Sequence, residues 1–221
     1  MQGKLIVITG LDGAGKTTLA KKLVLYMRES GFDAEYAYGR SALRLAKIIA
    51  LPGRKTHLSC QTSEDQYCTD RDKKRELFRR HKIIGGLYRT LLLLDAVIHL
   101  SRKVNPALRN GKIVVCDRYL YDTVLTDMAV DMHNSDLQTI SVINMCEKIL
   151  PKPNLSIFLD VSEGFSMRRK DDISSIEYLR DRRGTYQRIA TVKEMHVVNG
   201  DDEPDVVFDA AAKVITHEIG L

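Results

Sequence analysis

A short segment near the start of the chain has the residue types and spacing that bind a triphosphate. Gly10 to Thr17 reads GLDGAGKT and fits the pattern G-x-x-x-x-G-K-[ST]. In this motif the glycines let backbone N–H groups point at phosphate oxygens, the lysine reaches the β- and γ-phosphates, and the hydroxyl residue binds Mg²⁺. We therefore expect Lys16 to be catalytic, Thr17 to bind the metal, and ATP to be held by Gly10, Leu11, Asp12, Gly13, Ala14, Gly15, Lys16, Thr17 and Thr18.

Asp12 is unusual inside a phosphate loop, because a carboxylate close to phosphates costs Coulomb energy unless a cation or a hydroxyl group compensates it. It can orient an acceptor hydroxyl group or the metal ion, and we count it among the catalytic candidates. A purely local role in the turn is the alternative, since aspartate is common in turns.

A second group of candidates follows an apolar run at Ile113 to Cys116. Asp117 and Arg118 come directly after this run, and in parallel sheets ligands bind at the carboxyl ends of the strands. A carboxylate there can hold Mg²⁺, and a guanidinium can pair with a phosphate during phosphoryl transfer. We expect Asp117 to bind the metal and Arg118 to be catalytic, with helix capping as the alternative for Asp117.

Arginines are concentrated between residues 168 and 188, after the fourth apolar run. One interpretation is a solvated helix face, which is what most charge runs are. The other is a lid, over about residues 163–185, whose arginines close over the transferring phosphoryl group. The candidates for this catalytic role are Arg168, Arg169, Arg182 and Arg183.

These residues need a scaffold that brings distant segments to one edge. Short apolar runs occur at residues 5–8, 34–38, 113–116, 155–159 and 195–198, separated by segments long enough for helical crossovers. This alternation predicts an α/β fold of the P-loop NTPase type, a five-stranded parallel sheet flanked by helices on both faces, with the lid added to it. The chain of 221 residues shows no linker or internal repeat, so we expect a single domain over residues 1–221.

Two helices are predicted with the most detail. The first begins at the phosphate loop and ends near Gly31, and its buried stripe consists of Leu19, Leu23 and Met27. A longer helix is predicted from about Leu87 to Arg102, and its leucines form an unusually broad apolar face. Such a face suits either core packing or a homodimer interface. Residues 51–72 lack periodicity, and we interpret them as an insertion on the acceptor side.

The composition excludes several classes of protein. Hydrophobic residues make up 44% and charged residues 29% of the chain, as in ordinary globular proteins. No apolar run approaches the ~18 residues of a membrane span, so we expect no membrane partner. The four cysteines fit no CxxC pattern, which favours reduced thiols and a cytoplasmic protein. The net charge of +5 suits polyanions, but the basic clusters hold few aromatic residues for base stacking, and we expect no nucleic acid partner.

Together these motifs resemble those of the thymidylate kinase family. GLDGAGKTT at residues 10–18, Asp117-Arg118-Tyr119 as the family's DRY element and the strand-like segment 153–160 all match, and the arginine-rich segment up to residue 186 is similar to the family's lid. The resemblance covers most of the chain. It implies Mg²⁺-dependent phosphate transfer from ATP to a nucleoside monophosphate, in a homodimer packed through helices. It also implies that Asp117, Arg118 and Tyr119 contact the acceptor, and that the catalytic arginines come from the lid, since residue 13 is a glycine.

Three positions differ from the family pattern. Its Arg-Glu-Pro-Gly after the second strand is replaced by residues 38–41, Tyr-Gly-Arg-Ser, which leaves Arg40 as the expected clamp on the acceptor phosphate. The phenylalanine and arginine that contact thymine in the family fall within residues 91–98, where leucines, Asp95 and Ala96 stand. The serine after DRY-x-x is replaced by Asp122. We expect dTMP as the first acceptor, with another nucleoside monophosphate, a deoxynucleoside or another phosphorylated metabolite as alternatives.

A protein of another class could share the loop, because a P-loop predicts phosphate binding and not a reaction. The alternative is a nucleotide-dependent switch that hydrolyses ATP or GTP without an acceptor. The chain contains no Asn-Lys-x-Asp element for guanine, and residues 181–184 match D-x-x-G only within the charged segment. The sequence therefore favours a kinase.

Overall fold

The computed structural model describes residues 3–40, 80–130, 135–169 and 176–220. Within these residues, parallel strands form one five-stranded sheet in the order β2-β3-β1-β4-β5. The strands are β1 (Lys4–Gly10), β2 (Ala34–Tyr38), β3 (Ile113–Asp117), β4 (Leu155–Asp160) and β5 (His196–Asn199). The predicted α/β class with its five-stranded parallel sheet is confirmed.

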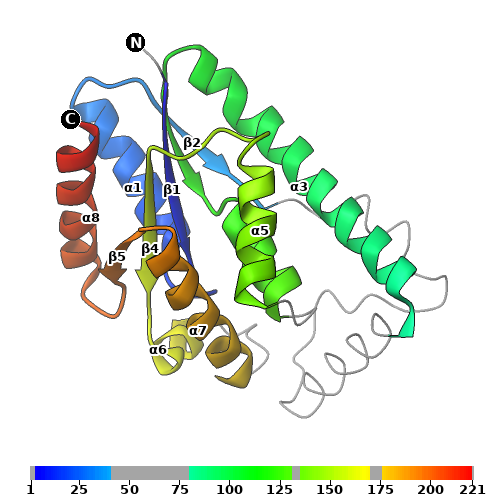
Figure 1. Ribbon diagram of the computed structural model, residues 1–221. Coiled ribbons are helices and arrows are strands. Elements are labelled where there is room, and N and C mark those ends of the chain that lie inside the picture. Colours follow the sequence, from blue (N-terminus) through cyan, green and yellow to red (C-terminus); the bar gives the residue numbers. More distant parts are fainter. Residues whose placement is uncertain (1–2, 41–79, 131–134, 170–175, 221) are drawn as a thin grey trace.

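The central strands are apolar along almost their whole length because helices cover both faces of the sheet. Helices α1 (Lys16–Glu29) and α8 (Pro204–Ile219) lie on one face, and α3 (Lys82–Arg109), α5 (Asp136–Cys146) and α7 (Ile176–Val192) lie on the other (Figure 1). The predicted stripe of α1 is buried, together with Ala20 and Val24.

The register of the sheet brings three strand ends together. Ile8 in β1 is paired with Asp117 in β3 on one side and with Ile157 in β4 on the other. The start of β4 is fixed by Asn154, whose Oδ1 accepts a hydrogen bond from the Leu5 amide at 2.8 Å. The loop after β1 therefore emerges between the ends of β3 and β4, which is where ligands bind in such sheets.

Helix α3 is longer than the sequence suggested and is only half buried. It spans Lys82–Arg109, beyond the predicted bounds at both ends, and continues past Pro106, which it contains in its last turn. One side of the helix, including Leu92, Leu100 and Val104, belongs to the core. The opposite side exposes apolar side chains to solvent, namely Ile83, Leu87, Leu94 and Ile98.

Short helices surround the site edge of the sheet. Directly after β3, α4 (Leu120–Thr123) runs into a π-helix, η2 (Val124–Val130). The π-helix was not predicted. π-Helical turns are rare in proteins, and those that occur often lie at functional sites. After β4, α6 (Glu163–Arg169) and α7 form the described part of the predicted lid.

Several sequence-based expectations concern residues outside the described part of the chain. These are the interpretation of residues 51–72 as an acceptor-side insertion, and the thiols of Cys60 and Cys68. Cys116 and Cys146 are described, and both are buried free thiols. No helix in the described ranges is both long enough and apolar enough to cross a membrane.

Candidate active site

The chain between β1 and α1 forms the phosphate loop. Gly13 and Gly15 have positive φ angles of 81° and 87°, a conformation that favours glycine. A side chain at residue 13 would also place its Cβ only 2.7 Å from the carbonyl oxygen of Ser166 in α6. Helix α1 has no side-chain cap, so its first N–H groups are available to phosphate oxygens.

Lys16 lies beneath this loop, where it is only 4% exposed. Its ammonium group donates a hydrogen bond to the Leu11 carbonyl oxygen. Burial, with a further contribution from the nearby Arg118 charge, lowers the pKa of Lys16 to about 8. The side chain is thus positioned under the phosphate loop, in a place where an anionic ligand would favour its charged form.

Thr17 and Asp117 meet as the sequence predicted for a metal site. The Asp117 carboxylate is fully buried, and its Oδ2 accepts hydrogen bonds from Thr17 Oγ1 at 2.5 Å and from Tyr36 Oη at 3.0 Å. Its Oδ1 is buried and has no hydrogen-bond partner among the residues that the structure describes. Burial and the Asp117 charge raise the pKa of Tyr36, so this hydroxyl remains a donor. A hydroxyl oxygen beside an unpaired carboxylate oxygen is the kind of ligand set that suits Mg²⁺.

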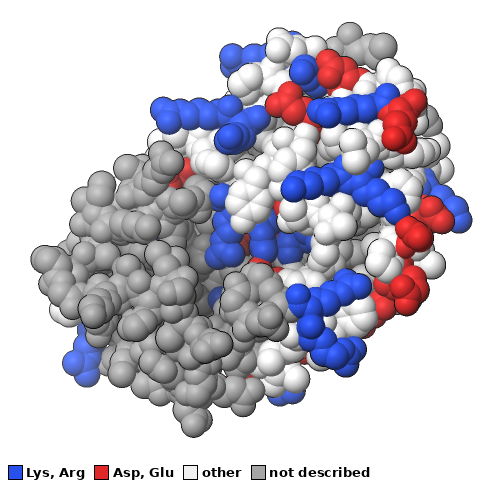
Figure 2. All heavy atoms as spheres, turned by 180° about the vertical axis from the view of Figure 1, so that it is seen from behind, with Lys and Arg blue, Asp and Glu red and all other residues white. Residues whose placement is uncertain are grey.

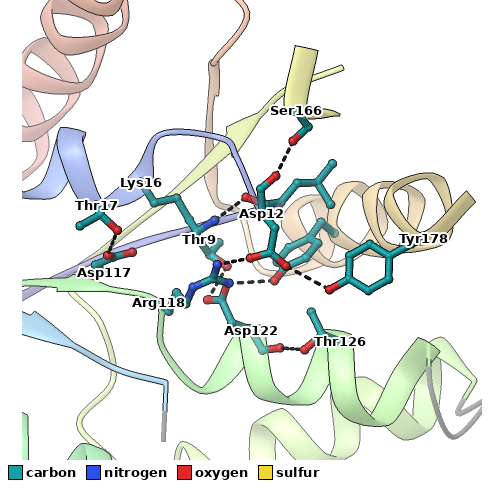
Figure 3. Close-up of polar contacts among 12 residues, drawn as sticks. Thr9, Asp12, Lys16, Thr17, Asp117, Arg118, Asp122, Thr126, Ser166 and Tyr178 are labelled. Carbon is teal, nitrogen blue, oxygen red and sulfur yellow. Dashed lines mark hydrogen bonds and ion pairs between the residues drawn. The ribbon is translucent and has the colours of Figure 1, made fainter. Parts of the chain in front are cut away.

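Arg118 lies between two carboxylates from different elements (Figure 3). Its Nη2 pairs with Asp12 Oδ1 in the phosphate loop, and its Nη1 pairs with Asp122 Oδ1 in α4 at 3.2 Å. Burial opposes the charge of Arg118, but Asp122 and Asp12 together raise its pKa. Burial would likewise raise the pKa of Asp12, yet the Arg118 and Lys16 charges hold it well below its usual range. The cation that the sequence analysis required beside Asp12 is therefore Arg118.

Asp12 also connects the loop to the lid helices. Its Oδ2 accepts a hydrogen bond from Tyr178 Oη in α7 at 3.0 Å, and its backbone carbonyl accepts one from Ser166 Oγ in α6. The guanidinium of Arg182 stacks on the Tyr178 ring at 3.7 Å, and the charge of Arg40 contributes to the low pKa of Asp12. Arg40 and Arg182, both predicted site residues, thus lie close to the phosphate loop.

The other lid arginines separate into different environments. Arg169 approaches the loop, with its Nη1 at 3.6 Å from where a Cβ on Gly15 would lie, and it lines the cavity. Arg168 stacks on Phe165, as Arg169 does, but does not line the cavity. Arg183 pairs with Asp160 at 2.8 Å and with Glu163 at 3.1 Å. These contacts hold Arg183 between β4, α6 and α7, and it is not among the residues that line the described cavity.

Tyr119 requires a correction. It was predicted to contact the acceptor, whereas the structure buries its ring in the core and its hydroxyl donates to the Pro151 carbonyl oxygen at 2.7 Å. The strand end turns so that Arg118, with a φ angle of 68°, points toward the loop while the next side chain points inward. Only the backbone N–H of Tyr119 contributes to the site network, through Asp122.

A cavity of about 610 Å³ runs from the phosphate loop toward α8. Its loop end is lined by residues 12–18, and its far end by residues after β5 and in α8 that the sequence analysis did not single out: Gly200, Asp202, Pro204, Val207 and Phe208. Lys22 also lines it, with its ammonium 4.5 Å from the centre of the Phe208 ring. A charged end beside an apolar end fits a nucleotide, whose phosphates and base differ in the same way.

On one face of the described part of the chain, the basic residues do not form a continuous surface (Figure 2). On the face shown in Figure 2, Lys and Arg side chains lie in separate groups, and acidic side chains adjoin several of them. In the second basic cluster, Arg183 is paired with Asp160, and Arg188 is paired with Asp136 at 2.8 Å. The first cluster lies mostly outside the described residues.

Comparisons with known proteins agree with the geometry. The model of the family described as thymidylate kinase matches residues 44–211. A probable thymidylate kinase of Pyrococcus abyssi is 29% identical over 233 aligned positions, which cover 99% of this chain and 98% of that protein. A probable thymidylate kinase of Archaeoglobus fulgidus is 28% identical, covering 94% of this chain and 87% of that protein. A thymidylate kinase of Desulfotalea psychrophila is 31% identical, covering 76% of this chain and 68% of that protein.

Proposed function

Since the chain belongs to the thymidylate kinase family, and is by that membership a nucleoside monophosphate kinase, we propose that it transfers the γ-phosphoryl group of ATP to dTMP. The observation that carries this proposal is the meeting of two groups of residues at one edge of the sheet. Thr17 of the loop is hydrogen-bonded to Asp117 after β3, and Asp12 of the loop is paired with Arg118. A donor and an acceptor phosphate can therefore be held side by side, which is the main requirement of phosphoryl transfer.

The donor half of the site is the phosphate loop and the cavity beyond it. Backbone N–H groups of the loop and the ammonium group of Lys16 bind the phosphates of ATP, and the base extends toward Pro204 and Phe208. Thr17 and Asp117 would hold Mg²⁺. When bound, this ion neutralises charge on the β- and γ-phosphates.

The acceptor half is formed by Arg118 and Arg40. Their guanidinium groups balance the charge of the acceptor phosphate, which is mostly a dianion at pH 7 because its second pKa is about 6. One of its oxygens attacks the γ-phosphorus in line, the bond to the β-phosphate oxygen breaks, and ADP leaves. No general base is required for this attack. Asp12 keeps Arg118 oriented and electrically balanced until the acceptor arrives.

The lid contributes positive charge to the transferring group. Arg169 lines the cavity beside the loop, and Arg182 lies against Tyr178, which bonds to Asp12. Because the loop itself has only Gly13 and Ala14 at its tip, these two arginines supply the charge that stabilises the transition state. We assign them this role ahead of Arg168 and Arg183.

The test is conversion of ATP to ADP with Mg²⁺ against a panel of nucleoside monophosphates, deoxynucleosides and phosphorylated metabolites, with Lys16→Ala as the inactive control. We expect dTMP to stimulate turnover far more than any other acceptor. If another acceptor is preferred, the kinase stands but its specificity is different. If ATP binds and no acceptor stimulates its consumption, the kinase proposal is wrong and a nucleotide switch is the better account.

We further propose that the protein acts as a homodimer and in the cytoplasm, as a single domain with a lid. The exposed apolar side chains of α3 support the dimer, since a helix face of this kind is suited to a two-fold interface. The relatives named above, as thymidylate kinases, support a nucleotide substrate.

A further inference from the structure

Asp122 is a buried carboxylate of the site with four hydrogen-bond donors among the described residues. It lies outside the Asp117-Arg118-Tyr119 motif, from which Arg118 was predicted. Its carboxylate is fully buried. Oδ1 accepts from Arg118 Nη1 at 3.2 Å and from Tyr186 Oη at 2.9 Å. Oδ2 accepts from Thr9 Oγ1 at 2.9 Å and from the Tyr119 amide at 3.1 Å. Each oxygen thus has two donors, as a buried carboxylate requires.

These donors come from different elements of the fold. Thr9 belongs to β1 immediately before the phosphate loop, Tyr119 precedes α4, and Tyr186 lies in α7, the helix that carries Tyr178 and Arg182. The Tyr186 ring is itself fixed, stacked on Phe158 with the ring centres 5.7 Å apart. Asp122 therefore has very little freedom to move, and neither does any group bonded to it.

Arg118 needs such a fixed partner. Its φ angle of 68° is in the left-handed region, which a non-glycine residue occupies only when its surroundings enforce it. Its other partner, Asp12, is in the loop that receives the donor phosphates, and that carboxylate is shared with Tyr178. Incoming phosphates compete with Asp12 for Arg118, but they cannot replace Asp122, which lies behind it and is fully buried.

The residue type matters as well as the position. The serine of the family pattern at this position offers one short hydroxyl and no charge. Here a full carboxylate balances Arg118 from the protein side while leaving the far edge of the guanidinium for a ligand. Charge-assisted hydrogen bonds are about twice as strong as neutral ones, so an aspartate holds the Arg118 guanidinium more firmly than a serine would.

We propose that Asp122 is a positioning residue that fixes Arg118 for the acceptor phosphate and connects it, through Tyr186, to the lid helix α7. The inference rests on the proposed function, because it takes Arg118 to bind that phosphate. It predicts that the charge of Asp122 matters more for the acceptor, which Arg118 binds directly, than for ATP, which Asp122 affects only by supporting the charge of Lys16.

The test compares Asp122→Asn with Glu147→Gln. Glu147 serves as the control because it is a partly buried carboxylate that bonds to Tyr121 Oη of α4 at 2.9 Å and to Lys193 Nζ, just after α7, at 2.8 Å. Its contacts do not include Arg118 among the described residues. We expect Asp122→Asn to lower kcat/KM for dTMP by about 10–100-fold, as for residues that orient a metal ligand, and to change the Kd for ATP much less. Glu147→Gln should leave kcat/KM for dTMP unchanged.

A second readout does not depend on turnover. In ¹⁵N NMR spectra of the arginine side chains, with Arg118→Lys used for assignment, the Arg118 guanidinium should rotate slowly in the natural protein and in Glu147→Gln, and fast in Asp122→Asn. If Asp122→Asn keeps both slow rotation and full kcat/KM, Asp12 alone fixes Arg118 and the inference is wrong. If the two variants lose activity equally, the role is merely structural. If the natural protein does not phosphorylate dTMP, the proposed function fails by itself, and the NMR result still decides the position of Arg118.

Discussion

Lys16 carries its charge in a place that disfavours it. Burial lowers the pKa of its ammonium group to about 8, and phosphates bound above it would raise that pKa again. Above pH 8, ATP binding must therefore be accompanied by proton uptake. We expect the affinity for ATP, measured by calorimetry, to fall by up to ~10-fold per pH unit above pH 8 and to vary little between pH 7 and 8.

Lys16→Met is the control for this pH dependence. It should bind ATP weakly at every pH and without the decline above pH 8. An affinity of the natural protein that stays constant up to pH 9.5 would mean that Lys16 keeps its proton without any ligand.

Gly39 packs directly against the backbone of Arg118. Its amide donates to the Asp117 carbonyl oxygen at 2.9 Å, and a Cβ on Gly39 would overlap the carbonyl group of Arg118. Gly39→Ala must push the Arg118 backbone out of place, so we expect a loss of activity together with about 1–3 kcal/mol of stability, measured by urea unfolding. Gly164→Ala in α6, where a Cβ would meet nothing within 4 Å, should show neither loss. Equal behaviour of the two variants would contradict this account of Gly39.

Single residues were predictable from the sequence where a motif specifies their spacing. Lys16, Thr17, Asp117 and Arg118 are where the motifs placed them, because each motif joins one strand end to a fixed local geometry. The partners from distant segments, such as Tyr178, were not predictable, because only the folded chain brings them close. Asp122 was noticed in the sequence only as the residue that stands in place of the serine after DRY-x-x. Its pairing with Arg118 could not be predicted, because it depends on the left-handed turn at Arg118 before α4.

At the scale of elements, α6 determines which arginine reaches the phosphates. Arg168 and Arg169 are neighbours on this helix and both stack on Phe165, but only Arg169 lines the cavity. We expect Arg169→Ala to lower kcat by a factor on the order of 10³, as for an arginine that stabilises the transition state. Arg168→Ala should cost far less, measured in the same steady-state assay. A similar loss in both would indicate that stacking on Phe165, and not contact with phosphate, is the shared role.

The bounds of elements were predicted less well than their existence. The predicted helix from Leu87 to Arg102 is a continuous helix over Lys82–Arg109. It includes Pro106, although a proline inside a helix removes one backbone hydrogen bond, and the neighbouring Val104 and Ala107 are buried in the core. The π-helix Val124–Val130 has no sequence signal at all. It follows α4 without a break, and its side chains Val124, Leu125 and Met128 are buried. Its winding follows from packing and not from local propensity.

At the scale of the whole molecule, the exposed side of α3 is the surface that we propose packs against a second copy of the chain. Leu87, Leu94 and Ile98 are 51%, 46% and 40% exposed and recur at a spacing that places them on one helix face. We expect Leu94→Glu to convert the dimer to a monomer in analytical ultracentrifugation, because a charge buried at an interface is costly. Leu137→Glu on α5, where the side chain is 80% exposed, should leave the dimer intact. A natural protein that is monomeric at all concentrations would refute the dimer proposal.

The overall architecture was predictable because strands that alternate with helices along the chain can form only a few folds, most of them built on a parallel sheet. The order of the strands was not predicted, since it depends on which neighbours pair in space. That order nevertheless places β1 between β3 and β4, so that the loop, Asp117 and Asp160 share one edge. The site therefore follows from the topology as much as from its motifs.

The contact between Gly13 and Ser166 also constrains how this protein can evolve. A side chain at residue 13 would collide with the Ser166 carbonyl oxygen of α6, at 2.7 Å from its first carbon. An arginine in the loop and α6 in its present position are thus mutually exclusive. A lineage that moved its catalytic arginine from lid to loop would also have to move α6, so the effect of a substitution at residue 13 depends on the position of that helix.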